Sequence, residues 1–167
     1  PPLNFAKKPG PSPPEPAVQP TAHTNVALAS AGAKTLSGYR GEALLDGEYI
    51  HYDGGNGYSY CRWSETAPCE IVVELDKYYT LNKIDLLLWD KDTRHYKYKL
   101  YSSVDGRYWD LIKDNSTGEH KSWQEISFAD TDIKYIKVEG TYNSANTGFH
   151  MVELQAMYDD GTPFTVS

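Results

Sequence analysis

The hydrophobic pattern predicts two different kinds of strand within residues 81–109. Residues 84–89 (Ile-Asp-Leu-Leu-Leu-Trp) are almost all apolar, which is typical of a strand covered on both faces. Residues 96–101 instead alternate apolar and polar positions, as a half-buried strand does. The polar segment 90–95 between them is predicted to be a loop, and Asp105-Gly106 predicts a hairpin turn. A loop between two rigid strands is a usual place for functional residues.

The rest of the chain repeats the strand pattern and has no convincing helical periodicity. We therefore predict an all-β fold, an antiparallel β-sandwich or jelly roll of about eight strands. Val26–Ala33 is predicted to be a first strand or a lead-in to it. The other predicted strands are Tyr58–Trp63, Glu70–Leu75, Trp109–Ile112, Trp123–Phe128, Ile133–Gly140 and Met151–Tyr158.

Composition divides the chain into three parts. Residues 1–24 are rich in proline and poor in large apolar side chains, so we expect a disordered linker there. Its functional alternative is a proline-rich ligand for a groove in another protein. Residues 25–160 are expected to form the β-sandwich, and residues 161–167 a C-terminal tail.

The net charge of -7 limits the kinds of partner. Lys7, Lys8 and Glu15 give residues 1–24 a charge of +1, so the remainder carries -8 by subtraction. Such an acidic surface repels phosphate backbones and anionic lipid headgroups, which argues against nucleic acid as a partner. No apolar run reaches the roughly 20 residues that span a bilayer, so no transmembrane segment is predicted.

Cys61 and Cys69 are the only cysteines of the chain. A disulfide across the intervening turn is compatible with their spacing if the compartment is oxidising. Without a histidine partner, two cysteines at this spacing do not make a zinc site. We favour free thiols, because the resemblance described below implies an intracellular protein.

Five segments, in order, resemble motifs of the discoidin, or coagulation-factor C-type, domain of the galactose-binding-like superfamily. These are the "LxDG" opening at 44–47 with Trp63 downstream, the strand 70–75, the hairpin "SxDGxxW" at 103–109, the strand 135–140 and the closing Glu153-Leu154. The resemblance covers residues 25–158 and implies the discoidin-like jelly roll.

A narrower resemblance lies in segments 87–98 and 140–150, which are similar to the discoidin-like repeats of BTB/POZ-BACK proteins. That branch implies an intracellular scaffold or adaptor role within a larger polypeptide. The chain lacks the cysteines that join the two ends of the sandwich in secreted discoidin domains, which weakens the extracellular and membrane-binding interpretations.

The superfamily resemblance also implies a calcium site. Sugar-binding members often hold structural calcium with an aspartate of the "DG" turn and a glutamate near the C-terminus, here Asp46 and Glu153. Calcium takes six to eight oxygen ligands, which a turn and a distant carboxylate can supply. In the alternative interpretation, Asp46 caps its own turn, Glu153 faces solvent or pairs with a base, and no cofactor is required.

The resemblance further places several loops at one end of the sandwich, where we expect a ligand-binding surface. Aromatic rings with arginine, histidine and asparagine suit either a glycan or a protein partner. Alternatively, Arg94 pairs with Asp90 or Asp92 and the aromatic rings close the end of the fold. The candidate residues are Tyr52, Tyr58, Trp89, Arg94, His95, Tyr96, Asn143, Asn146, Phe149 and His150.

No catalytic residue is predicted. The chain has no G-x-S-x-G nucleophile motif, no phosphate loop and no zinc-ligand pair at helical spacing. We therefore expect a non-catalytic module that binds a protein partner through its loops, with carbohydrate binding, with or without calcium, in a secreted protein as the alternative.

Overall fold

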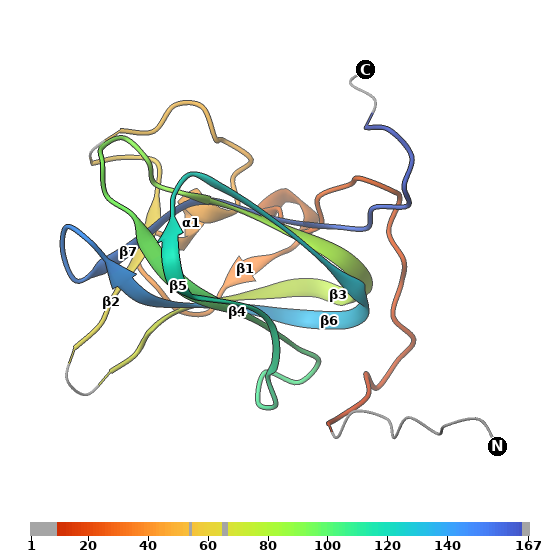
Figure 1. Ribbon diagram of the computed structural model, residues 1–167. Coiled ribbons are helices and arrows are strands. Elements are labelled where there is room, and N and C mark those ends of the chain that lie inside the picture. The colour runs from red at the N-terminus through yellow and green to blue at the C-terminus, as the bar shows by residue number, and fades with distance from the viewer. Residues whose placement is uncertain (1–9, 54, 65–66, 165–167) are drawn as a thin grey trace.

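The computed structural model describes residues 10–53, 55–64 and 67–164. Its regular structure is almost entirely one antiparallel sheet of seven strands, which confirms the all-β prediction (Figure 1). The strands are β1 (Lys34–Thr35), β2 (Ser59–Arg62), β3 (Cys69–Leu88), β4 (Tyr96–Ser103), β5 (Asp110–His120), β6 (Trp123–Asn143) and β7 (Gly148–Met157). The two short helices are the 3-10 turn η1 (Ala29–Ala31) and α1 (Gly41–Leu44).

Two long strands shape the sandwich, because β3 and β6 each belong to both of its layers. The first half of β3 pairs with the second half of β6, and the second half of β3 pairs with the first half of β6. Register shifts interrupt the ladder between Glu74 and Tyr79 and between Leu81 and Lys83. One layer therefore runs β5-β4-β6-β3-β1, and the other runs β6-β3-β7-β2.

The core lies between these layers and explains the two hydrophobic patterns. Along β4, Tyr96, Tyr98 and Leu100 are fully buried while the residues between them are partly exposed, as the alternation predicts. Residues 84–89 are buried on both faces. Their inner face joins the main core, and Leu87 and Trp89 pack on the outer side with Val152, Tyr52 and Tyr58.

Three predictions about individual segments differ from the structure. The strands predicted at 70–75 and 84–89 are one strand, β3, and those predicted at 123–128 and 133–140 are likewise one strand, β6. Val26–Ala33 is not a strand but the lead-in to β1, and it contains η1. The bond from Val26 N–H to the carbonyl of Ala156 attaches it to β7.

The proline-rich segment contacts the sandwich in its second half. Val18 forms an isolated parallel bridge with Tyr79, and His23 N–H donates to the carbonyl of Tyr158. Figure 1 shows this red-to-orange segment running beside the sandwich. Residues 10–24 are thus partly attached rather than free, while residues 1–9 and 165–167 lie outside the described residues. The proposed division into linker, sandwich and tail stays a prediction.

The prediction of free thiols is wrong, because Cys61 and Cys69 form a disulfide. Cys61 lies near the end of β2 and Cys69 begins β3, with their Cα atoms 5.2 Å apart. Both are buried in the core, and the bond connects the edge strand β2 to the start of β3. Among the described residues, no helix is long and apolar enough to cross a membrane.

Candidate functional site

The loops at one end of the sandwich are held together by side-chain hydrogen bonds. The hydroxyl of Tyr52 donates to Asp90 Oδ1 at 2.7 Å, and the indole N–H of Trp89 donates to the carbonyl of Asp53 at 2.6 Å. These bonds join the 46–58 loop to the 89–95 loop. We call this assembly, together with the 143–148 loop, the loop end; its three loops lie on the left of Figure 1.

The third loop is attached through backbone and hydroxyl groups. His95 N–H donates to Ser144 Oγ at 3.0 Å, and Ser144 N–H donates to the carbonyl of His95 at 3.0 Å. The ring of His95 lies 5.7 Å from that of Tyr142. The structure thus brings together the three loops that the candidate residues occupy.

Arg94 covers Trp89 at the centre of the loop end. Its guanidinium carbon lies 4.6 Å from the indole ring centre, and only 6% of Trp89 is exposed. Asp92 fixes the guanidinium with bonds of 2.9 Å from Nε and 2.7 Å from Nη2. These hydrogen bonds lower the pKa of Asp92, so the pair is charged at neutral pH. The arginine is therefore held in place by its own loop.

His150 lies behind this pair as a neutral ring. Its ring centre is 5.0 Å from that of Tyr58 and 6.4 Å from that of Trp89. Burial, followed by the positive charges of Arg94 and Arg62, lowers the pKa of His150 to about 4. At neutral pH His150 is therefore uncharged, and its Nδ1 lies 3.4 Å from Nη1 of Arg94, from which it can accept a hydrogen bond.

Several candidate residues support the loops and are not exposed to a ligand. Tyr96 and Phe149 are fully buried, and the Tyr96 hydroxyl donates to the carbonyl of Trp89 at 2.9 Å. Asn143, which is 5% exposed, donates to the carbonyl of Gly148 at 2.6 Å and to Asn146 Oδ1 at 3.0 Å. For Tyr96, Asn143 and Phe149, a direct ligand contact is therefore excluded in this structure. The hydroxyl of Tyr96 and the amide of Asn143 stabilise the loop backbone instead, and the ring of Phe149 packs in the core.

Of a cluster that adjoins the 46–58 loop, only Tyr58 was identified as a candidate from the sequence. Arg40 lies 5.8 Å from the ring centre of Tyr58 and 5.9 Å from that of Tyr60, and it donates to the carbonyl of Gly55. Tyr39, which is 59% exposed, stacks on Tyr60 at 4.9 Å. The guanidinium of Arg62 lies 5.4 Å from the ring centre of Tyr60. We call these residues the tyrosine–arginine strip and include them in the loop end, since Arg40 contacts the 46–58 loop: Tyr39, Arg40, Tyr58, Tyr60 and Arg62.

A buried carboxyl group lies below the 46–58 loop. Glu153 is fully buried on β7, and its Oε2 accepts a hydrogen bond of 2.9 Å from Gly47 N–H. No described residue donates to its other oxygen, Oε1. Burial and the neighbouring carboxylate of Asp46 raise the pKa of Glu153 to about 9. Glu153 therefore neither faces solvent nor pairs with a base.

Comparison with known proteins settles the family. Residues 29–154 match the F5/8 type C domain. The chain belongs to this family, as its motifs predict. It is 36% identical over 143 residues to BTB/POZ domain-containing protein 9 of Drosophila melanogaster, covering 86% of the chain but only 20% of that relative.

Solved structures share the fold of this F5/8 type C domain at low sequence identity. A CBM32 module from Clostridium perfringens, in complex with GalNAc-β-1,3-galactose, has a TM-score of 0.58 at 20% identity, covering 75% of this chain and 93% of that module. A chitosan-binding module from Paenibacillus has a TM-score of 0.60 at 21% identity, covering 80% and 98%. At this identity the similarity concerns the fold alone.

The carboxyl pair fits the calcium that the superfamily resemblance implies. An ion beside Asp46 and Glu153 would supply the missing partner of Oε1 and would take the place of the proton that Glu153 holds at neutral pH. Asp46 also caps its own turn, since its Oδ1 accepts from Glu48 N–H at 2.8 Å. The capping role of Asp46 is therefore present in this structure, while the calcium site stays a prediction.

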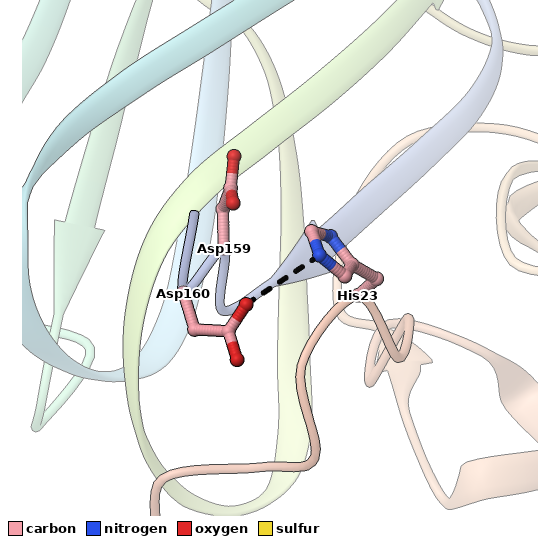
Figure 2. Close-up of side chains that lie close together, drawn as sticks. All are labelled: His23, Asp159 and Asp160. Carbon is pink, nitrogen blue, oxygen red and sulfur yellow. Dashed lines mark ion pairs between the residues drawn. The ribbon is translucent and has the colours of Figure 1, made fainter. Parts of the chain in front are cut away.

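A second acidic cluster of the domain has a simpler explanation. His23, Asp159 and Asp160 have ligand atoms within 4.8 Å of one another, and Figure 2 shows Asp160 facing His23 as an ion pair. However, Nε2 of His23 already lies 2.8 Å from the carbonyl of Thr162, and both aspartates are largely exposed. This cluster ties the N-terminal segment to the residues after β7.

Proposed function

We propose that this F5/8 type C domain is a non-catalytic recognition module of a larger polypeptide, which binds a protein partner through the loop end. The observation that carries the proposal is the tyrosine–arginine strip. Tyrosine and arginine are over-represented among residues that dominate binding energy in protein interfaces. In the strip, Arg40 and Arg62 are held against rings, so less side-chain freedom is lost on binding.

The state of Trp89 also supports a protein partner. A sugar-binding site needs an open aromatic face with polar groups at its edge. Here the Trp89 ring is covered by Arg94, and its indole N–H already donates to Asp53. Arg94 is in turn engaged by Asp92. The exposed contact area is therefore the strip, which offers both rings and positive charge.

The relatives support a place in a larger protein. The chain spans about a fifth of the length of the BTB/POZ domain-containing relatives that it matches. These relatives carry no enzyme name, which agrees with a scaffold or adaptor role. They also support an intracellular setting, whereas the Cys61–Cys69 disulfide is the observation that favours secretion.

Carbohydrate binding is the second candidate function, and the Asp46–Glu153 pair is the observation that favours it. The superfamily resemblance associates a calcium site at these positions with sugar-binding members. The similar solved structures include modules in complex with GalNAc-β-1,3-galactose or named for chitosan binding. In this candidate, calcium fixes the 46–58 loop while Tyr58 and His150 contact the sugar.

A matched pair of variants tests the proposal. Three proteins are immobilised: the wild-type chain, Tyr39→Ala/Arg40→Ala in the strip, and Arg107→Ala/Tyr108→Ala in the β4–β5 hairpin. Proteins that each of them retains from a cell lysate are quantified by mass spectrometry. Both variants remove an adjacent tyrosine and arginine, but only one affects the loop end. We expect a protein that the wild type and the hairpin variant retain and the strip variant loses.

Direct titrations then separate the two candidate functions. The retained protein, once purified, should bind the wild-type chain at least tenfold more tightly than the strip variant. If no retained protein depends on the strip, the proposed function is wrong. Calorimetry with galactose, N-acetylgalactosamine and glucosamine oligomers, in calcium and in EDTA, tests the second candidate. Calcium-dependent heat that is lost in Tyr58→Ala would favour carbohydrate.

A further inference from the structure

A second surface with binding chemistry lies on the outer face of the β6-β3-β7 layer. The register of these strands sets Glu125, Asp85 and Gln155 side by side, because Asp85 pairs with Glu125 on β6 and with Gln155 on β7. Together they form the floor of a hollow of about 420 Å³. No residue of the tyrosine–arginine strip lines this hollow.

Two exposed aromatic rings form the wall of the hollow. Tyr49 is 43% exposed and Trp123 is 39% exposed, and their ring centres lie 5.6 Å apart in an edge-to-face arrangement. Beyond Tyr49 the floor continues into a neighbouring hollow of about 510 Å³ that reaches His23 and Asp159. We call the two hollows together the strand-face groove.

Asp85 gives the floor an unused acceptor. Only 6% of Asp85 is exposed, and its Oδ2 lies 3.3 Å from the ammonium of Lys83. Among the described residues, none donates a hydrogen bond to its Oδ1. A buried carboxylate oxygen without a donor is unfavourable, and a positively charged group bound over Asp85 would offset part of that cost.

The net charge of the groove determines which charge its ligand should carry. Asp85, Glu125 and Asp159 contribute three negative charges and Lys83 one positive charge, which leaves -2 from these four residues. Lys83 is shared between Asp85 and Glu125, both at 3.3 Å, so its charge is already engaged. A cationic ligand is therefore favoured over a neutral or anionic one.

The arrangement of rings and acceptors in the groove favours a guanidinium group. A planar cation stacks on an aromatic face while its edge donates several hydrogen bonds in one plane. The groove offers the rings of Tyr49 and Trp123 next to the oxygens of Asp85, Glu125 and Gln155. An ammonium group donates to fewer of these acceptors at once and does not stack in the same way.

We propose that the strand-face groove binds an arginine side chain on a basic segment of a partner protein. The unpaired acceptor, the acidic floor and the paired exposed rings together favour this ligand. Tyr49 lies in the 46–58 loop, but no residue of the tyrosine–arginine strip lines the groove, so its binding is tested separately from the proposed function.

Nuclear magnetic resonance titration of the isotope-labelled 167-residue chain tests this inference. The probes are short capped peptides that are identical except for a central arginine, lysine or citrulline, which is the neutral analogue of arginine. We expect the arginine peptide to give saturable shifts of the Trp123 indole and of the Tyr49, Asp85 and Gln155 amides. Binding should be about tenfold weaker for citrulline and several-fold weaker for lysine.

Matched variants locate the site. Tyr49→Ala and Glu125→Gln should each weaken arginine-peptide binding at least fivefold. Tyr108→Ala, at a tyrosine that is 42% exposed, and Glu119→Gln, at another exposed glutamate, should leave binding unchanged. The inference is overturned if no saturable shift occurs, if citrulline or lysine binds as well as arginine, or if the shifts centre on the tyrosine–arginine strip.

Discussion

Gly47 N–H donates a hydrogen bond of 2.9 Å to Oε2 of Glu153, a residue 106 positions later in the chain. This bond connects the loop after α1 to the buried middle of β7. The same loop carries Tyr52 of the loop end and Tyr49 of the strand-face groove, so the bond connects Glu153 to a loop that contributes to both surfaces.

The first prediction concerns the pH dependence of stability. An unfolded glutamate ionises near 4.5, whereas folded Glu153 holds its proton up to a pKa of about 9. Between these values the folded state binds more protons than the unfolded state, so the free energy of unfolding falls as the pH rises. The slope from this group is at most about 1.4 kcal/mol per pH unit. Urea unfolding in EDTA between pH 5 and pH 8.5 measures it.

Glu153→Gln is the control for this prediction, since glutamine keeps an acceptor for Gly47 and does not titrate. The fall in stability with pH should be much smaller in the variant. Equal slopes in the wild type and in Glu153→Gln would show that Glu153 is not the group responsible.

The second prediction concerns calcium. An ion at Asp46 and Glu153 binds the folded state only, so calcium should raise the melting temperature, with about 2.7 kcal/mol of stabilisation at a hundredfold excess over the dissociation constant. Asp46→Asn and Glu153→Gln should each abolish the effect. Asp159→Asn, in the His23 cluster, should not change it. Calcium stabilisation that disappears only in Asp159→Asn would assign the ion to that cluster.

The fold could be predicted from the sequence because most of its signals are local. Alternation along β4 and the continuous apolar run at 84–89 identify strands and burial without knowledge of their partners. What could not be predicted is the continuity of β3 and β6. Their middle segments are polar and resemble turns, yet they remain extended because each half pairs with a different part of the other strand.

The candidate site was predicted less completely, for a physical reason. Trp89, Arg94 and His150 were identified from their chemical types, and the structure does bring them together. Arg40 and Tyr60 were missed because they are 20 residues apart in the sequence. A contact between such positions produces no periodic pattern in the sequence. The adjacent pair Tyr39-Arg40 was the only signal, and such pairs are common.

The third prediction concerns the disulfide. Cys61→Ser/Cys69→Ser should lower the free energy of unfolding by about 2 to 3 kcal/mol, the range expected for closing so short a loop. The free energy of unfolding of the wild type, measured with and without reductant, should differ by the same amount. Alkylation of the native chain followed by mass spectrometry should find neither cysteine labelled. Full labelling without denaturant would contradict the bond.

The fourth prediction concerns the close packing of β6 against β7. A Cβ atom at Gly140 would lie 2.5 Å from Cβ and Cγ of Phe149, far inside contact distance. Phe149 is fully buried and meets Tyr96 edge to face, so it has little room to move. Gly140→Ala should therefore destabilise the domain by about 1 to 3 kcal/mol through overpacking.

A double-mutant cycle identifies the cause of this effect. Phe149→Ala alone should cost about 3 to 5 kcal/mol because it leaves a cavity. In the background of Phe149→Ala, Gly140→Ala should cost much less than in the wild type, since the ring that it meets is gone. If the cost of Gly140→Ala is the same in both backgrounds, the clash with Phe149 is not its source, and the glycine is needed for the backbone of β6 itself.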